Sequence, residues 1–463
     1  MNRGSGSPYT ATAVLREMLL ADNYIELKED QPWSLKAGSK YFFCRNSASV
    51  FAFGIGKRVD LLKEAPKFSI VGAHTDSPAL RLKPPCSAQE SCGLSLVSCE
   101  VYGGGIWQTW FDRDLGIAGK VIVKDPQSGA LETKTVLIRR PLLRIPTVAP
   151  HLDSPYADGF KVNKEHELRA ILCEAETERA TNCAVMLTPD GQKPRHHRAL
   201  LAAVAKELSC PPEAIVALDL RLCDAQPAAL GGAANEFVFG QGIDNLNGSY
   251  CTAAGFIKAN KDGGLEEAAD VRFLTLFDHE ECGSLSPQGA NSAVVTQTME
   301  RILIGIAAGM EPRPAPHDGF IREALCISIR KSLVISVDNS HAVHPNYAGK
   351  HEMNQPPMLN RGPTVKHNVN QRYASDAEGT LILQIIAKEH GIPLQEFVIR
   401  QDTNCGTTIG PTTSGKTCVR TIDIGNPQLS MHSIREVCGT KDVAYMTDLI
   451  YSFFTDFAKI VIN

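Results

Sequence analysis

An apolar, strand-like run in residues 272–283, RFLTLFDHEECG, leads into two adjacent carboxylates, Glu280 and Glu281. Apolar and aromatic residues at this density predict a buried strand, and the carboxylates would lie where that strand leaves the core. Side chains of consecutive residues at a strand end diverge, so one carboxylate can bind a metal ion while the other acts as a general base. Adjacent glutamates are also common on surface helices, so this interpretation depends on the other segments.

Four further segments join a strand or a turn to ionisable side chains. The segment 68–78, FSIVGAHTDSP, would supply His74 as a metal ligand and Asp76 as the acceptor that fixes the imidazole tautomer. The second segment, 239–249, supplies Asp244 and Asn245. The third, 332–346, supplies Asp338, His341 and His344, and the fourth, 426–436, supplies His432. Each has a simpler explanation alone, because a histidine at a strand end can be a satisfied core residue and Asp-Asn before a helix can be a cap.

The combined set has the composition of a two-zinc site: His74, Asp244, Glu281, Asp338 and His432. A carboxylate can bridge two cations about 3.5–4 Å apart, and each cation then needs one histidine and one further carboxylate to keep a position for water. Nitrogen and oxygen ligands without thiolates also suit Co²⁺ or Mn²⁺. We therefore expect two metal ions per chain, with Zn²⁺ as the first candidate.

Seven motifs carry a resemblance to a known family: HTDSP, GIDN, FDHEECGS, VDNSHAVHPNY, QRYASD, CGTTIGP and SMHSIRE. In this order and spacing the chain, from about residue 11 to its C-terminus, resembles the aspartyl aminopeptidases, dinuclear zinc exopeptidases that remove N-terminal Asp or Glu. The resemblance implies that Asp244 bridges the metals, that His74 and Asp338 complete one zinc site, and that Glu281 and His432 complete the other. Glu280 becomes the general base, which takes a proton from water so that a hydroxide held between the zincs can attack the scissile carbonyl.

The resemblance also assigns substrate contacts. It implies that the substrate is bound by Lys366, Tyr373 and His341, by the site residues Glu280, Asp338 and His432, and by His151 from a neighbouring subunit. Lys366 would pair with the acidic side chain of the substrate. Backbone amides of residues 406–410 would line the pocket. A polar stretch, residues 161–198, has no clear counterpart in the family.

The positions of these segments predict an interrupted α/β catalytic domain. Alternating helices and strands before residue 79 and after residue 230 favour a three-layer α/β/α zinc-exopeptidase domain, formed by residues 1–79 and 230–463. Short alternating strands in residues 80–229 favour an inserted, smaller β-rich domain. The resemblance implies that this domain mediates dimerisation and that dimers assemble into a homododecamer. His151 could instead be a histidine packed within its own turn.

Helices are expected at 11–27, 199–208, 246–260, 291–308, 375–390 and 442–462, and strands at 40–54, 68–74, 94–102, 119–123, 135–139, 271–277, 333–337, 396–400 and 419–424. The run GGGIWQTW, residues 103–110, lacks the pattern of a phosphate loop, and we interpret it as a turn with aromatic packing. Residues 165–178 are typical of a solvated helix, and residues 190–197 of a polar surface on which His196 and His197 are exposed.

Composition excludes some partners. A formal net charge of −4 without a basic cluster argues against nucleic acid, and no run approaches the roughly 20 apolar residues of a membrane span. Fourteen cysteines without a C-x-x-C pair predict free thiols in a reducing compartment. With no signal-peptide pattern, we expect a cytoplasmic enzyme that acts on peptides with an acidic N-terminus.

Two alternatives remain open at this point. A related dinuclear zinc hydrolase, such as a neutral aminopeptidase or a deacylase, would keep the same ligands but not prefer acidic N-termini. A non-enzymatic assembly protein would have no need of an unligated carboxylate, Glu280, beside the metals.

Overall fold

A nine-stranded mixed sheet forms the centre of the molecule. The computed structural model describes residues 2–84, 86, 89–152, 159–183, 191, 195–261, 263–309 and 318–460. The strand order is β1-β2-β3-β15-β4-β16-β20-β18-β19. The strands span Ile25–Glu26 (β1), Lys40–Arg45 (β2), Ser49–Ile55 (β3), Val271–Phe277 (β15), Phe68–His74 (β4), Leu333–Val337 (β16), Arg420–Gly425 (β20), Thr364–His367 (β18) and Gln395–Val398 (β19).

The central strands β15, β4, β16 and β20 are parallel to one another. Every residue of β15, β4 and β16 is buried, because helices cover both faces of the sheet, as parallel strands require. Their carboxyl ends therefore meet at one edge, and this edge carries the ionisable residues.

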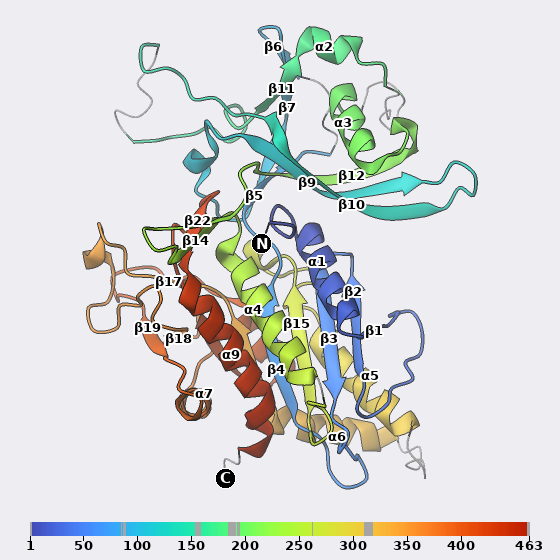
Figure 1. Cartoon of the computed structure of the whole chain (residues 1–463), viewed down its shortest axis with the longest axis vertical. Helices are drawn as coiled ribbons and strands as arrows, with labels where there is room; N and C mark the ends of the chain where they lie inside the picture. Colours follow the sequence, from blue (N-terminus) through green and yellow to red (C-terminus); the bar gives the residue numbers. More distant parts are fainter. Residues whose placement is uncertain are drawn as a thin grey trace.

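Helices pack on both faces of this sheet (Figure 1). One face holds α1 (Pro8–Ala21), α4 (Ile243–Asn260), α7 (Ala377–Glu389) and α9 (Thr440–Asp456). The other holds α5 (Val294–Ala308), α6 (Asp318–Lys331) and α8 (Ile409–Thr417). In β15, Leu274 and Leu276 join the first layer and Phe273 and Phe277 the second, as the alternation of side chains in a strand dictates. The predicted three-layer architecture is confirmed.

Residues 79–224 supply the strands of a separate β-rich lobe, at the top of Figure 1. A five-stranded sheet has the order β10-β9-β12-β5-β8, and a three-stranded sheet the order β11-β7-β6. The strands are β5 (Ala79–Leu82), β6 (Gln89–Ser91), β7 (Leu94–Val97), β8 (Cys99–Tyr102), β9 (Leu115–Lys124), β10 (Leu131–Leu143), β11 (Ala170–Glu174) and β12 (Ile215–Asp224). With α2 (Ala175–Ala180) and α3 (Arg198–Leu208) they enclose a core that includes Trp107 and Trp110. The predicted β-rich domain is thus present, while its limits, 80–229, stay a prediction.

A second five-stranded sheet lies beside the edge of the central sheet that carries the ionisable residues. It joins β13 (Ala229–Gly231), β14 (Phe237–Gly240), β22 (Glu436–Gly439), β21 (Pro427–Leu429) and β17 (Ser340–His341). None of these strands was predicted, because each is only two to four residues long and so carries little periodicity. The sheet brings the turn between β21 and β22 next to the start of α4.

Several predicted boundaries are corrected. The first helix covers 8–21 rather than 11–27, because Ser7 caps it, forming a capping box with Thr10. The predicted strand 40–54 is the hairpin β2–β3. Residues 165–178 are not one solvated helix but the end of a loop, β11 and part of α2.

The prediction that His196 and His197 are exposed is wrong, because the two side chains are 3% and 0% exposed. They pack beside α3, where His197 Nδ1 lies 3.1 Å from the Ser95 hydroxyl. Part of the predicted polar surface, residues 190 and 192–194, lies outside the described residues. In the part of the chain that is described, no helix combines the length and apolar character needed to cross a membrane.

Candidate metal centre

The strand ends place three of the five predicted ligands. His74 is the last residue of β4, Asp338 follows β16, and Glu281 lies in a short 3-10 helix, Glu280–Cys282, just after β15. Because β15, β4 and β16 are adjacent and parallel, these residues emerge at the same edge of the sheet, as ligand sites do in open α/β folds. Asp244 comes from the first turn of α4, and His432 from the turn between β21 and β22.

The Asp244 carboxylate lies between the two histidines. Its Oδ1 is 3.5 Å from His74 Nε2 and its Oδ2 is 3.3 Å from His432 Nε2. Asp338 Oδ1 lies 3.7 Å from His74 Nε2, and Glu281 Oε2 lies 3.4 Å from His432 Nε2. The groups His74–Asp244–Asp338 and Asp244–Glu281–His432 each present ligand atoms within 4.8 Å of one another. The two groups share Asp244, which is the arrangement that a bridging carboxylate needs.

Both histidines present Nε2 to this cluster. His74 Nδ1 lies 3.0 Å from the backbone carbonyl of Asp76, and His432 Nδ1 lies 3.0 Å from that of Gly104. A carbonyl only accepts hydrogen bonds, so each Nδ1 carries a proton, and in the neutral imidazole Nε2 then has the free lone pair. This is the tautomer of a metal-ligating histidine held by a neighbouring acceptor.

The unpaired atoms of the cluster fit two divalent cations. His74 Nε2, Asp244 Oδ1 and Glu281 Oε1 are buried and have no hydrogen-bond partner among the described residues. Burial, followed by the Asp244 and Glu280 carboxylates, raises the pKa of Glu281 well above its ordinary value. Burial alone would lower the pKa of His74, but the neighbouring carboxylates raise it well above that of a free histidine. Such a cluster lacks positive charge, and metal ions would supply it.

The Glu280 carboxylate lies next to His74, whereas that of Glu281 lies next to His432. Glu280 Oε2 lies 4.0 Å from His74 Nε2. Burial raises the pKa of Glu280 to about 8; the Asp338, Asp76 and Asp244 carboxylates add to this rise and His74 opposes it. A carboxylate with its pKa near neutrality can take up and release a proton at working pH.

The role expected for Asp76 is partly wrong. Its backbone carbonyl, rather than its carboxylate, lies nearest to His74 Nδ1, with the carboxylate Oδ1 at 3.5 Å. The carboxylate accepts hydrogen bonds from the backbone N–H groups of Glu280 and Glu281, at 3.2 and 3.1 Å. Asp76 therefore orients the imidazole through its backbone and holds the Glu280–Glu281 backbone through its side chain.

Three of the predicted substrate residues gather next to Asp338. Lys366 is 3% exposed, its Nζ donates to the Asn339 carbonyl at 2.8 Å, and it lies 5.3 Å from the centre of the Tyr373 ring. The rings of His341 and Tyr373 both lie 6.2 Å from that of Phe397. Among the described residues, no carboxylate forms a direct ion pair with Lys366, and the buried Asp423 carboxylate interacts with it only at longer range.

His151 is not part of this group within one chain. It lies in an exposed turn of the β-rich domain, where the Leu152 N–H donates to the Ala149 carbonyl. No hydrogen bond or ion pair among the described residues joins it to the metal ligands. His344 is also separate, because its contacts are with Asn346, Tyr347 and His351.

Two residues next to the cluster, Glu436 and Tyr102, were not predicted from the sequence. Glu436, 1% exposed, accepts the N–H of His432 at 2.8 Å and that of Asp244 at 3.1 Å, so one carboxylate fixes the backbone of two ligands. Its presence in the SMHSIRE motif was a usable signal. Tyr102, at the end of β8, donates to Asp76 Oδ2 at 2.6 Å, and only its approach in space reveals it.

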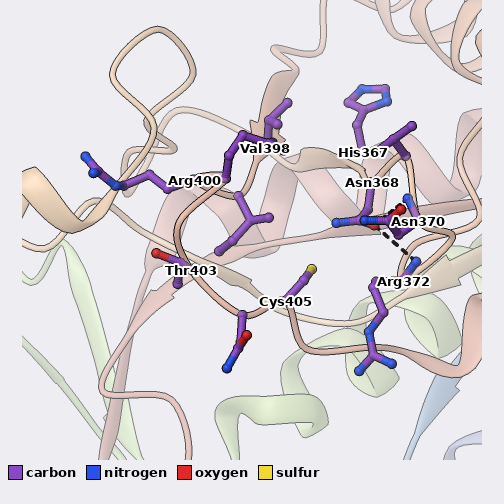
Figure 2. A pocket seen from close by; sticks show the side chains of 12 residues that line it. His367, Asn368, Asn370, Arg372, Val398, Arg400, Thr403 and Cys405 are labelled. Carbon is purple, nitrogen blue, oxygen red and sulfur yellow. Dashed lines mark hydrogen bonds between the residues drawn. The ribbon is translucent and has the colours of Figure 1, made fainter.

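A separate pocket of about 440 Å³ opens beside the substrate residues. Figure 2 shows His367, Arg372, Arg400 and Cys405 around it. His367 and Arg372 are chain neighbours of Lys366 and Tyr373, but none of the five predicted ligands lines the pocket. It therefore adjoins the substrate residues and not the metal cluster.

The sequence matches the model of the aminopeptidase I zinc metalloprotease (M18) family over residues 2–454. It is 42% identical to an aspartyl aminopeptidase of Dictyostelium discoideum, covering 98% of this chain and 95% of that protein. It is 39% identical to aspartyl aminopeptidase 4 of Saccharomyces cerevisiae, covering 98% of this chain and 93% of that protein.

Solved structures share the fold. The cryo-EM structure of a complex of Ape4 and Nbr1 superposes with a TM-score of 0.91 at 39% identity, covering 100% of this chain and 86% of that chain. The structure of the Saccharomyces cerevisiae mApe1 dodecamer superposes with a TM-score of 0.83 at 28% identity, covering 99% of this chain and 95% of that chain.

Proposed function

Because this chain belongs to the aminopeptidase I zinc metalloprotease (M18) family, we propose that it removes N-terminal acidic residues, Asp and Glu, from peptides. The observation that carries the proposal is the Asp244 carboxylate, whose two oxygens lie 3.5 and 3.3 Å from the Nε2 atoms of two histidines. The aspartyl aminopeptidases among its relatives support the choice of substrate.

Two zinc ions would be held by the predicted ligands. His74, Asp244 and Asp338 would hold one, and Asp244, Glu281 and His432 the other, with Co²⁺ or Mn²⁺ as chemically suitable replacements. Bound there, the metals supply Lewis-acid polarisation of the scissile carbonyl and lower the pKa of water to near 7. The chain itself must fix the ligands and handle the protons.

Glu280 is the group that moves the proton. It takes a proton from the attacking water and delivers it to the leaving amine. Asp76 keeps it in place through the hydrogen bond to the Glu280 N–H. The 4.0 Å distance between Glu280 Oε2 and His74 Nε2 supports a position for Glu280 beside the first metal ion.

Lys366 selects the acidic side chain of the substrate. It is buried, lacks a direct carboxylate partner among the described residues, and lies close to Tyr373. A substrate carboxylate would supply a direct ion-pair partner, whereas an Ala or Leu side chain would not. His341 and Tyr373 would line the same subsite.

His151 would act from a neighbouring subunit. Its exposed position in the β-rich domain suits a contact made across a dimer interface, with the β-rich domain, residues 80–229, as the dimerisation domain. We extend this to a homododecamer, the assembly named for mApe1 of Saccharomyces cerevisiae. We place the enzyme in the cytoplasm, since its fourteen cysteines include no C-x-x-C pair, which is typical of a chain from a reducing compartment.

The test combines metal analysis with a substrate panel. Purified protein should contain two equivalents of zinc and should cleave Asp and Glu chromogenic substrates far faster than Ala or Leu ones. Equal rates on all four would replace the proposal by a neutral aminopeptidase, and activity only on N-acyl substrates would replace it by a deacylase. Two bound metals with no hydrolysis of any substrate would favour a non-enzymatic assembly protein.

A further inference from the structure

The glycine-rich run that looked like an ordinary turn lies against the metal centre. Tyr102 ends β8, and residues 103–105 follow it directly. The Gly104 carbonyl holds His432 Nδ1 at 3.0 Å, and the Ile106 N–H donates to the His432 carbonyl at 2.9 Å. The β-rich domain therefore contacts a predicted metal ligand directly.

Gly103 lies equally close to a second ligand. It has a φ of +74°, and a Cβ placed on it would come within 3.1 Å of the Glu281 Cβ. A side chain here would push Glu281 unless Pro78, at 3.4 Å, gave way. The need for glycine at this position thus comes from the metal centre as well as from the backbone conformation.

Tyr102 completes the contact through Asp76. Its hydroxyl donates to Asp76 Oδ2 at 2.6 Å, within the range of charge-assisted O–H···O⁻ hydrogen bonds. The same carboxylate accepts the N–H groups of Glu280 and Glu281. The Tyr102 ring is held in turn by Arg221 of β12, whose guanidinium carbon lies 4.1 Å from the ring centre and which is 3% exposed.

We propose that Tyr102 is a positioning residue of the reaction: through Asp76 it fixes the Glu280–Glu281 backbone, and so makes the β-rich domain part of the catalytic machinery. This rests on the function proposed above, in which Glu280 is the base and Glu281 a ligand. Without the hydroxyl, Asp76 Oδ2 keeps one donor instead of two, and the carboxylate is free to rotate away from the Glu280–Glu281 segment. A shift of about 1 Å in a reacting group can cost about 10²-fold in rate.

The first test compares two tyrosines. Tyr102→Phe should lower kcat on the best substrate about 10–100-fold, the range seen when partners of metal ligands are removed, while KM changes less than about threefold. Zinc affinity, measured by competition with a chromogenic chelator, should fall in the same variant because Glu281 is less well held.

Tyr9→Phe is the matched control. The Tyr9 hydroxyl also donates to a carboxylate, Asp219 Oδ2, at 2.6 Å, and Tyr9 is 4% exposed, but it has no hydrogen bond to the Glu280–Glu281 segment. It should lose thermal stability while keeping kcat and zinc affinity. Equal losses of kcat in the two variants would overturn the proposal, because Tyr102 would then act only through domain stability.

A second pair of variants tests the same contact from the backbone. Gly103→Ala and Gly93→Ala should introduce similar backbone strain, since the φ values of the two glycines are +74° and +77°. The two sites differ in their surroundings, because nothing lies within 4 Å of a Cβ at Gly93. Only Gly103→Ala should lower zinc affinity, by about tenfold or more. This pair decides the question if Tyr102→Phe does not fold.

The outcomes separate this proposal from the proposed function. Wild-type protein that cleaves neutral substrates as fast as acidic ones would refute the substrate assignment, yet zinc affinity, read without substrate, would still test Tyr102. Tyr102→Phe and Gly103→Ala proteins with kcat and zinc affinity within twofold of wild type would overturn the positioning role, whatever the substrate.

Discussion

Glu280 and Glu281 are adjacent in the sequence, but their carboxylates have different neighbours. Glu281 Oε2 lies 3.4 Å from His432 Nε2, and Glu280 Oε2 lies 4.0 Å from His74 Nε2. Asp76 holds the backbone N–H of both. At the scale of single residues, these neighbours fit the proposed division of roles, in which one carboxylate binds metal and the other transfers protons, although His74, Glu280 and Glu281 also present ligand atoms within 4.8 Å of one another.

Glu280→Gln separates these roles. The amide keeps the shape of the side chain but cannot accept the proton, so kcat should fall by about 10²–10⁴-fold with little change in KM. Elemental analysis should still find two zinc ions per chain, because Glu280 is not a proposed ligand. Near-normal turnover would remove Glu280 as the base, and loss of zinc would make it a ligand.

Lys366→Leu tests selectivity. It should lower kcat/KM on Asp and Glu substrates far more than on Ala and Leu ones, because a desolvated substrate carboxylate without a partner costs about 3–5 kcal/mol. Lys67→Leu is the control: Lys67 also donates only to backbone carbonyls, of Ala458 and Ile460, and is not part of the site. Equal losses on all four substrates in Lys366→Leu would assign Lys366 to structure or chemistry instead.

At the scale of elements, α3 of the β-rich domain depends on groups that the sequence suggested were solvated. The Glu178 carboxylate accepts the N–H groups of Arg198 and Ala199 at 2.6 and 3.0 Å, which satisfies the first turn of α3 and complements its dipole. His197 precedes this turn and is fully buried next to Glu178, at 4.0 Å. Charged and titratable groups thus hold a buried helix end.

Acid should weaken the β-rich domain through these histidines. Burial lowers the pKa of His196 to about 4, with Arg195 and His197 adding to the effect, and burial lowers the pKa of His197 although Glu178 opposes it. In the unfolded chain both have pKa values near 6.5. As the pH falls from about 6.5 towards 4, the unfolded state binds protons that the folded state does not, so the free energy of unfolding falls.

Urea unfolding at several pH values would measure this. In a Trp33→Phe background the remaining tryptophans, Trp107 and Trp110, lie in the core of the β-rich domain and report its unfolding. The double variant His196→Gln and His197→Gln should show a shallower fall in stability between pH 6.5 and 4. An unchanged slope would exclude the two histidines as the cause.

At the scale of the whole molecule, the β-rich domain contains one segment that contacts the candidate metal centre and one exposed histidine that does not. It contacts its own centre through Tyr102, Gly103 and Gly104. His151, in contrast, is exposed and not joined to that centre. We therefore expect His151 to serve another subunit, so activity should depend on assembly.

Mixed oligomers test this dependence. Chains carrying His151→Ala or Glu280→Gln should each be nearly inactive alone. Co-assembled and purified through two different tags, they should regain activity in up to about one quarter of all sites, because some sites combine an intact metal domain with an intact capping histidine. Verified mixed oligomers no more active than the sum of their parents, together with an impaired His151→Ala, would mean that His151 acts within its own chain.

Sequence motifs and local patterns were enough to predict the family, the fold and the five predicted metal ligands that lie together in one cluster. The family and the three-layer fold with a β-rich domain are confirmed. The buried strands β4, β15 and β16 are mostly apolar, and each apolar run leads directly into an ionisable residue. Parallel neighbours place their carboxyl ends at one edge, so this local pattern already implied a shared site. The metal and substrate roles of these residues stay predictions.

Only the tertiary structure decided which distant groups support that site. Asp76 turned out to hold the Glu280–Glu281 backbone, and Tyr102 to hold Asp76, across sequence separations of 204 and 26 residues. His196 and His197 are polar in the sequence yet buried. Periodicity reports which face of an element is apolar, but it carries no information about which separate elements meet. A glycine required by the approach of Glu281 therefore looks, in the sequence, like any other turn glycine.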